Sequence, residues 1–288
     1  MKKDYPNKST FFHRVDIDGK RHLMIRPIRW IVCIAVASAF LISYGLDIQV
    51  LEGSMVASRL MGFHMVDLFG AMEVVAAHGE IATNLAIGTL FVAIIYWILG
   101  GRVFCSWVCP YGLLSELGEI IHKKLLAKGI IRKRKKMTTS VKYVFAAVFL
   151  FASFLTGRLV FESINVVGIL SRLMIYGLVE SVLVVIAVLI AEIFWSRRFW
   201  CRSVCPSGAT YGLLNKVAII RIEADRSRCD KCGECVPQCH APEALSGVFA
   251  AKDGKVMLTS TDCTGCAKCM DACRRDVFHF DHRLKGLI

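Results

Sequence analysis

Four long apolar runs, separated by polar and charged segments, dominate the pattern of the chain. Each run is poor in charged residues, and together they occupy Trp30–Leu46, Ile81–Gly100, Val141–Thr156 and Leu173–Trp195. Because an α-helix rises ~1.5 Å per residue and the hydrocarbon core of a bilayer is ~30 Å thick, each run is about long enough to cross a membrane. The pattern predicts four transmembrane helices. Buried helices of a soluble protein are the alternative for the shorter first and third runs.

The distribution of basic residues predicts the direction of these helices. Lys and Arg number eight before the first run, ten from Gly101 to Lys142 and fifteen after the fourth run, but only one and two in the other two loops. Under the positive-inside rule, both termini and the central segment are cytoplasmic. We expect a multi-pass protein of the bacterial inner membrane. The net charge of +13 is then a consequence of topology, and no nucleic-acid partner is expected.

The second and fourth runs end in the same cysteine motif. Both motifs have the form Cys-x3-Cys-Pro, and they consist of Cys105, Cys109 and Pro110 and of Cys201, Cys205 and Pro206. Each half reads helix, outer loop, helix and motif, as in a parallel repeat with a pseudo-two-fold axis along the membrane normal. Proline suits the first position of a helix, so Cys109 and Cys205 are expected at helix N-termini. Three roles stay open for the four cysteines: a third metal centre, redox-active pairs, or packing.

Eight further cysteines form two iron–sulfur motifs near the C-terminus. In each motif the spacing is Cys-x2-Cys-x2-Cys-x3-Cys, which lets three thiolates cap one [4Fe–4S] cluster while the fourth reaches the other cluster. Zinc would leave cysteines unused, and disulfides need an oxidising compartment. We therefore predict two [4Fe–4S] clusters, with the ligand sets Cys229, Cys232, Cys235 and Cys273 for cluster 1 and Cys263, Cys266, Cys269 and Cys239 for cluster 2.

Short strand-like segments surround these motifs. They begin near Val217, Gly254 and Val277. The predicted fold class is a membrane α-helical domain, with four transmembrane helices in two parallel repeats, plus a small C-terminal α+β domain of the bacterial 2[4Fe–4S] ferredoxin type. The expected organisation is a cytoplasmic N-terminal segment at 1–29, the transmembrane domain at 30–216 and the ferredoxin-like domain at 217–288.

Two other segments show helical periodicity. Apolar residues recur at helical spacing over Met55–Ala77, which predicts a helix lying along the membrane surface in the first outer loop. Three roles stay open for it: lining a quinone entrance, forming a lid packed on the bundle, or docking a periplasmic partner. Tyr111–Lys128 has the pattern of an amphipathic cytoplasmic helix. Candidate groups for a quinone site are His64 in the outer loop and Glu180, an ionisable residue within the fourth run, although solvated surface positions would explain both.

With both halves and the cluster motifs identified, the chain resembles the NapH family over a stretch from about Arg26 to Asp281. The segments that carry the resemblance are Phe104-Cys105-Ser-Trp-Val-Cys109-Pro110, Trp200-Cys201-x3-Cys205-Pro206-x-Gly208-Ala209-x-Tyr211-Gly212 and the cluster motifs ending in Asp276-Val277-Phe278. The resemblance implies four spans, cytoplasmic termini and two C-terminal [4Fe–4S] clusters. It also implies oxidation of membrane quinol and transfer of electrons, with a periplasmic iron–sulfur partner of the NapG type, toward periplasmic nitrate reductase.

The chain departs from the usual ferredoxin pattern at two positions. Proline commonly follows the fourth cysteine of each motif, and here His240 and Arg274 occupy those positions. Two other functions compete with a quinol dehydrogenase subunit. One is a membrane polyferredoxin that supplies electrons for maturation of copper oxidase or nitrous oxide reductase, and the other is a structural membrane anchor.

Overall fold

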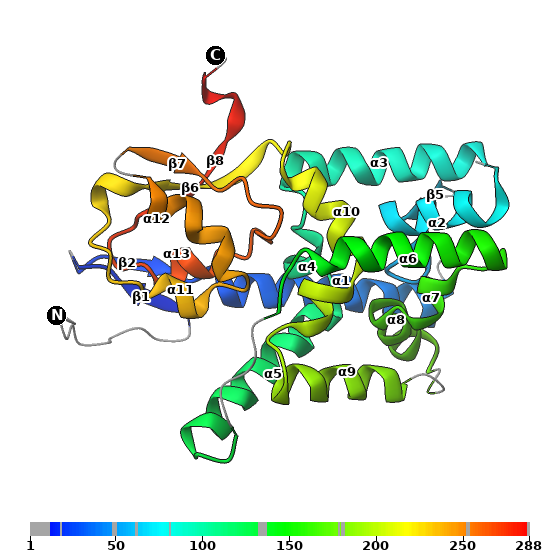
Figure 1. The fold of residues 1–288 in the computed structure, drawn as a ribbon, viewed down its shortest axis with the longest axis horizontal. Helices are drawn as coiled ribbons and strands as arrows, with labels where there is room; N and C mark the ends of the chain where they lie inside the picture. The colour runs from blue at the N-terminus through cyan, green and yellow to red at the C-terminus, as the bar shows by residue number, and fades with distance from the viewer. Residues whose placement is uncertain are drawn as a thin grey trace.

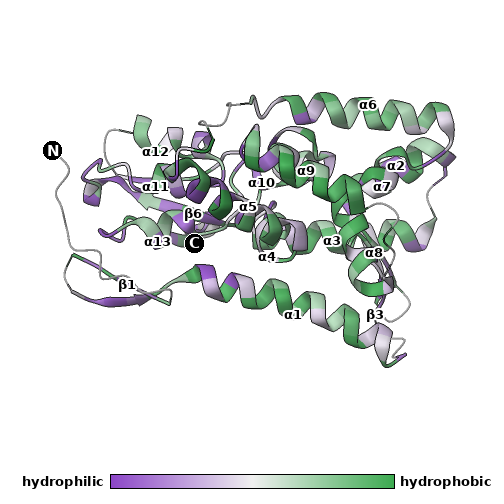
Figure 2. Ribbon diagram, turned by 90° about the horizontal axis from the view of Figure 1, so that it is seen from below, coloured by the Kyte–Doolittle hydropathy of each residue, from purple (hydrophilic) through white to green (hydrophobic). Residues whose placement is uncertain are grey.

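The structure, a computed structural model, describes residues 12–17, 19–47, 51–60, 63–80, 82–131, 137–177, 179, 182–251 and 254–286. A larger helical part and a smaller mixed part lie side by side along the long axis of the molecule (Figure 1). Coloured by hydropathy, the outer helices of the larger part are mostly hydrophobic, and polar residues gather on the smaller part (Figure 2). The domain boundary near residue 217 stays a prediction.

Four helices of the larger part fall on the predicted apolar runs: α1 (Ile25–Gly45), α3 (Thr83–Leu99), α6 (Val141–Thr156) and α9 (Val182–Phe194). Within the described ranges, α1 alone is both long and apolar enough to cross a membrane, since α3, α6 and α9 have 17, 16 and 13 residues. The fourth run is not one continuous helix. Its first residues end α8 (Val166–Tyr176), where Gly177 adopts a left-handed conformation, and Glu180 lies outside the described residues.

The first outer loop differs from the surface helix predicted over Met55–Ala77. Three short antiparallel strands, β3 (Leu51–Gly53), β4 (Ala57–Leu60) and β5 (Phe63–Val66), come first and pair in the order β3-β4-β5. They lead into α2 (Leu68–His78), whose Phe69 and Glu73 are fully buried. The apolar spacing therefore reflects a sheet and a partly buried helix: Val56 and Phe69 pack inside the helical part, whereas Phe63 and Met72 are exposed.

The short helix of each half of the repeat packs against helices of the other half. Both α2 and α8 have 11 residues and follow the first helix of their own half. Helix α2 packs on α6 and α10 (Pro206–Asn215) of the second half, whereas α8 packs on α1 and α5 (Pro110–Ala127) of the first half. The second half also contains the short α7 (Val160–Ile164). This reciprocal packing is what a pseudo-two-fold relation between the halves requires.

The Cys-x3-Cys-Pro segments follow α3 and α9 directly. In the first half the segment contains α4 (Phe104–Trp107) and in the second the π-helix η1 (Trp200–Val204). Cys109 and Cys205 are the N-cap residues of α5 and α10, each with proline at the start of the helix, as the sequence predicts. A buried apolar core surrounds both segments and includes Phe69, Tyr111 and Phe161.

The smaller part is a three-stranded antiparallel sheet with short helices. The strands β6 (Ile220–Asp225), β7 (Lys255–Met257) and β8 (Phe278–His282) pair in the order β7-β6-β8, which confirms the three predicted strands. The helical turns are η2 (Arg226–Arg228), α11 (Cys235–Gln238), η3 (Pro242–Leu245), α12 (Ser246–Ala250), α13 (Lys268–Ala272) and η4 (Arg283–Gly286).

The N-terminal segment packs on this smaller part. Its strands β1 (His13–Val15) and β2 (Arg21–Leu23) form a hairpin. The Ile17 amide donates to the carbonyl of Arg274 at 3.2 Å, and Arg14 contacts both the carbonyl of Cys273 and the carboxylate of Asp276. The hairpin thus covers the loop that follows the last cysteine. The sequence predicted a separate segment at 1–29 and did not indicate this packing.

Candidate electron-transfer sites

The structure brings the eight C-terminal cysteines together in two groups. Cys235 lies within electrostatic range of Cys229, Cys232 and Cys273. Cys269 lies in the same way among Cys263, Cys266 and Cys239. None of the eight is in a disulfide, and most of them belong to or pack against the core of the smaller part. The donor chemistry and the grouping fit thiolate-ligated iron–sulfur clusters, and the two ligand sets stay a prediction.

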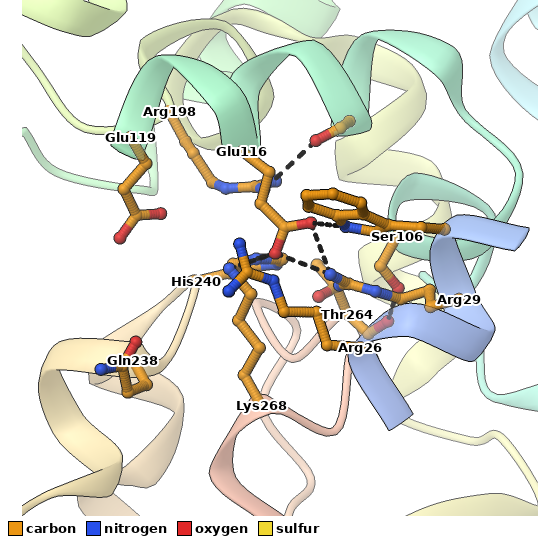
Figure 3. Close-up of polar contacts among 12 residues, drawn as sticks. Arg26, Arg29, Ser106, Glu116, Glu119, Arg198, Gln238, His240, Thr264 and Lys268 are labelled. Carbon is orange, nitrogen blue, oxygen red and sulfur yellow. Dashed lines mark hydrogen bonds and ion pairs between the residues drawn. The ribbon is translucent and has the colours of Figure 1, made fainter. Parts of the chain in front are cut away.

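A buried ionic network joins this domain to the helical part. Its centre is Glu116 on α5, which is 2% exposed and accepts hydrogen bonds from Arg29 at 2.6 Å and from the Trp30 indole at 2.7 Å (Figure 3). Lys268, next to Cys269, forms an ion pair with the same carboxylate. The network therefore links α1, α5 and the second cluster motif through one side chain.

His240, the residue that replaces the usual proline after Cys239, belongs to this network. Its Nε2 faces Glu116 Oε1 at 3.5 Å, and the imidazole is almost fully buried (Figure 3). Burial, together with the charges of Arg198 and Lys268, lowers the pKa of His240 well below its ordinary value, so the ring is neutral. A neutral imidazole faces the carboxylate without adding another buried charge.

The carboxylate at the centre stays ionised. Burial alone would raise the pKa of Glu116, but the His240 interaction and the charges of Lys268 and Arg29 outweigh it and hold that pKa far below its usual range. Burial lowers the pKa of Lys268 to about 8, against the opposing effect of Glu116. Lys268 is therefore mostly protonated at neutral pH, and the network holds the domain by charge-assisted hydrogen bonds.

A cavity of about 420 Å³ opens beside the network. It lies between α5, the start of α1 and the second cluster motif, and its lining includes Arg26, Glu119, Lys123, Gln238 and Lys268. One buried oxygen of Glu119, Oε2, has no hydrogen-bond partner. The volume lies within the range of small-molecule sites.

The helix α5 turns its polar face inward. Glu116 and Glu119 are buried, whereas Leu117 and Ile121 are 41% and 44% exposed. The amphipathic helix is confirmed at Pro110–Ala127. In the structure its polar face packs against the smaller part and much of its apolar face remains uncovered.

The four cysteines of the Cys-x3-Cys-Pro motifs line a second, enclosed cavity. It has a volume of about 30 Å³, and its lining contains Asp67, Asn165 and all four of these residues, Cys105, Cys109, Cys201 and Cys205. The sequence repeat suggested this convergence, and the packing of the two halves produces it. The same cavity receives residues from both outer loops, which the sequence did not indicate.

Two buried arginine side chains near this cavity form hydrogen bonds with the opposite half. Arg102 and Arg198 each stand three residues before the first cysteine of their motif. Arg102 donates to the carbonyl of Cys201 at 2.9 Å, whereas Arg198 donates to the carbonyl of Gly112 at 3.4 Å. Each guanidinium therefore reaches the opposite half. The sequence does contain a sign of this role, because the two arginines occupy equivalent positions in the repeat. Composition alone would not distinguish them from other arginines.

The first motif also touches the loop of the second cluster motif. Ser106 donates to the carbonyl of Thr264 at 2.6 Å, and the Trp107 indole donates to the carbonyl of Gly265 at 3.1 Å. Arg102 reaches Asp262 at 3.2 Å. The four-cysteine cavity and the loop that carries Cys263 are thus in direct structural contact.

One proposed quinone-site residue lies away from both cavities. His64 is on β5, where its ring pairs with Arg59 across the strands at the protein surface. Glu119 and Lys123 of the larger cavity were not predicted because they are ordinary polar positions of an amphipathic helix, and Arg26, Gln238 and Lys268 join them only through the packing of the two parts. Their only sequence signal was His240 in place of proline.

Comparisons with known proteins are consistent over most of the chain. It is 28% identical over 260 residues to the ferredoxin-type protein NapH of Escherichia coli, covering 88% of this chain and 89% of that protein. It is 30% identical over 242 residues to the methylamine utilization ferredoxin-type protein MauN of Methylorubrum extorquens, covering 83% of each. The chain belongs to the family of NapH and MauN ferredoxin-type proteins. No solved structure matches it.

A family model described as a 4Fe–4S binding domain adds a second finding about this NapH and MauN family member. It matches residues 81–128 and 178–223, one segment in each half of the repeat. Each matched segment contains one Cys-x3-Cys-Pro motif. The double match confirms the internal repeat. Together with the ferredoxin-type relatives, it identifies the chain as an iron–sulfur electron-transfer protein.

Proposed function

We propose that the chain is the iron–sulfur membrane subunit of a quinol dehydrogenase, with two C-terminal [4Fe–4S] clusters and both termini in the cytoplasm. Electrons would pass from membrane quinol to a periplasmic iron–sulfur partner and then toward periplasmic nitrate reductase. Cluster 1 would be held by Cys229, Cys232, Cys235 and Cys273 and cluster 2 by Cys263, Cys266, Cys269 and Cys239. Bound clusters would act as one-electron acceptors, and the side chains of the protein would bind the quinol and receive its hydrogen bonds.

The observation that carries this proposal is the 420 Å³ cavity beside the second cluster motif. Gln238 and Lys268 line it, and each is the immediate neighbour of a predicted ligand, Cys239 or Cys269. A quinol headgroup in this cavity would therefore lie close to cluster 2. Oxidation of one quinol to quinone releases two electrons and two protons, and two clusters accept one electron each.

The charges around the cavity suit a quinol. Glu119 has a lowered pKa because the charges of Arg197 and Lys268 outweigh the effect of burial, so its carboxylate is ionised. In this proposal a quinol hydroxyl donates to the Glu119 carboxylate, whose buried Oε2 has no hydrogen-bond partner in the structure. The two protons leave through the open side of the cavity to water. Arg26 and Lys123 at its edge would attract the partial negative charge on the quinone oxygens.

Exposed apolar side chains support a membrane location for the helical part. On α1 and α6, large apolar residues face outward, among them Ile31, Ile34, Val144, Phe151 and Phe154. Contiguous exposed apolar surface marks contact with lipid or with another protein. We propose that the helices predicted from the four apolar runs lie in the inner membrane, with the α5 apolar face at the cytoplasmic boundary.

A direct test measures reduction of the clusters by quinol. In proteoliposomes, a menaquinol analogue should reduce the clusters of the wild type, as followed by electron spin resonance. Glu119→Gln should slow this reduction about tenfold because a neutral amide is a weaker acceptor, while reduction by dithionite stays complete. The matched control is Glu243→Gln, an exposed carboxylate paired with Arg202. No reduction of the wild-type clusters by any quinol would overturn the quinol assignment.

The relatives named for methylamine utilization support a second candidate acceptor. In that case the same subunit would serve methylamine utilization in place of nitrate reduction. The reading frames next to this gene separate the two candidates. Nitrate reductase subunits beside it favour the first candidate, and other methylamine utilization proteins favour the second.

A further inference from the structure

Cations outnumber carboxylates where the helical part meets the second cluster motif. Two buried carboxylates at this junction are each shared by two cations. The two sets are Asp262 with Arg102 and Lys142, and Glu116 with Arg29 and Lys268. We propose that this excess of buried positive charge raises the reduction potential of cluster 2, so that quinol can reduce a cluster that is largely shielded from water. This role rests on the proposed function, which places cluster 2 beside the quinol cavity.

Burial makes these charges effective. Three of the four cations, Lys142, Arg29 and Arg102, are 0%, 1% and 2% exposed. Charges that are shielded from water are screened by salt much less than surface charges are. Four cations on two carboxylates leave a net charge of +2, and the imidazole of His240 beside them is neutral (Figure 3). Because uncompensated buried charge is costly, a negative group is expected next to these side chains.

The excess charge lies beside the predicted ligands of cluster 2. Arg102 is within electrostatic range of Cys263, and Lys268 is within range of Cys266. Lys142 contacts the carboxylate that comes directly before Cys263 in the sequence. A cluster bound by thiolates is an anion that becomes more negative on reduction, so nearby cations stabilise its reduced form most. The cations therefore raise its reduction potential.

A third carboxylate on α5 repeats the arrangement. Glu119 pairs with Arg197 and, at 3.5 Å, with Lys123. Arg197 lies within electrostatic range of Cys239, the predicted fourth ligand of cluster 2. Lys123 is half exposed, so water screens its charge more than that of Arg197. The positive excess thus extends around the ligand set of cluster 2.

Burial of the cluster alone would have the opposite effect on its potential. Cys266 and Cys269 are buried, and surroundings of low polarity disfavour the more negative, reduced form. Because quinol is a mild reductant, it would reduce such a cluster poorly without compensating charge. The cations at the junction offset the effect of burial.

The first cluster motif has a different charge balance within the described residues. Its ion pairs join one cation to one carboxylate, Arg14 to Asp276 and Arg275 to Asp230. A further carboxylate, that of Asp271, accepts a hydrogen bond from the amide of Ile25 at 2.9 Å. Arg228, Lys231 and Cys232 are exposed, so water reaches this motif. Tuning by buried cations is therefore expected for cluster 2 and not for cluster 1.

Redox titration of the purified full-length protein tests this tuning. Dithionite with mediators reduces the clusters without quinol, and electron spin resonance follows each cluster. Lys142→Met leaves Arg102 paired with Asp262 at 3.2 Å. It should lower the equilibrium constant for reduction of one cluster about three- to tenfold, which is about 30–60 mV for one electron. Arg197→Met should shift the same cluster in the same direction.

Two matched variants show which cluster responds. Lys255→Met removes a lysine that is 60% exposed and pairs with Glu223, so it should shift neither potential. Arg14→Met removes the cation that contacts the carbonyl of Cys273, so it should lower mainly the potential of the other cluster. Unchanged potentials in both Lys142→Met and Arg197→Met would overturn the proposal. A Lys142→Met shift confined to the cluster that responds to Arg14→Met would also overturn it.

Reduction by quinol separates the tuning from the proposed function. In proteoliposomes, quinol should reduce a smaller fraction of cluster 2 in Lys142→Met than in the wild type, because the potential of that cluster is lower. Equal fractions in the two proteins would overturn the role of these cations in quinol oxidation. If quinol reduces the clusters of no variant while the titration shows the expected shifts, the proposed function fails and the tuning stands.

Discussion

The two halves of the helical part share one plan but dock the cluster domain differently. The first half reaches that domain through buried groups: Glu116 and Arg102 are each 2% exposed. The second half has no counterpart of the Glu116 network: it adds the buried Lys142, which shares Asp262 with Arg102, and exposed contacts such as the pair between Arg202 and Glu243. At the position equivalent to Glu116 the second half has Gly212, where a Cβ would lie 2.8 Å from the carbonyl of Thr261. Both halves thus contribute cysteines to the four-cysteine cavity, whereas the Glu116 network belongs to the first half alone.

The largest effect is expected from Glu116→Gln. This change leaves Arg29 and Lys268 buried without their shared carboxylate, so it should lower the free energy of unfolding by about 3–5 kcal/mol. The loss should appear first as separation of the cluster domain, because the network joins α1 and α5 to the loop around Cys269. Limited proteolysis between the two parts, followed with a thermal unfolding curve in detergent, measures it.

The control for this prediction comes from the second half. Arg202→Gln breaks the contact with Glu243, which is 50% exposed, and should cost no more than about 1 kcal/mol. Equal losses from Glu116→Gln and Arg202→Gln would contradict the idea that the first half carries the docking.

A smaller difference is expected at Asp262, which two cations share. Asp262→Asn leaves Arg102 and Lys142 without a counter-charge and should cost about 3 kcal/mol. Lys142→Met removes one of the two cations, leaves Arg102 paired at 3.2 Å, and should cost less than about 1 kcal/mol. Chemical unfolding measures the loss of unfolding free energy in each variant and so compares the two losses. A Lys142→Met loss as large as that of Asp262→Asn would show that the site has no excess of positive charge.

The sequence predicted those features that depend on spacing along the chain. The repeat, the helix starts at Pro110 and Pro206 and the three strands of the small domain all follow from local signals, and the structure contains them. Fixed spacings between cysteines carry the same kind of information. Such features can be predicted because the residues that determine each of them lie close together in the sequence.

Other features depend on partners distant in sequence and could not be predicted. Glu116 and Lys268 are 152 positions apart by their numbers, and nothing near either residue indicates the other. The buried α2 was read as a surface helix because apolar periodicity does not distinguish lipid from a protein core. The exchange of α2 and α8 between the halves is likewise a property of packing, visible only once α6 and α5 are in place.

The smallest effect is expected from removing the N-cap side chains of the two short helices, α2 and α8. Asp67 accepts a hydrogen bond from the amide of Gly70 at 3.0 Å, and Asn165 accepts one from the amide of Val167 at 3.1 Å. Because each side chain satisfies one free amide of its helix, Asp67→Ala and Asn165→Ala should each lower the free energy of unfolding by about 1 kcal/mol. Asp67→Asn should restore the stability, since an amide oxygen caps as well as a carboxylate. Thermal unfolding of the three variants tests this, and a loss several times larger for Asp67→Ala than for Asn165→Ala would show that the two halves are not equivalent even at the cavity they share.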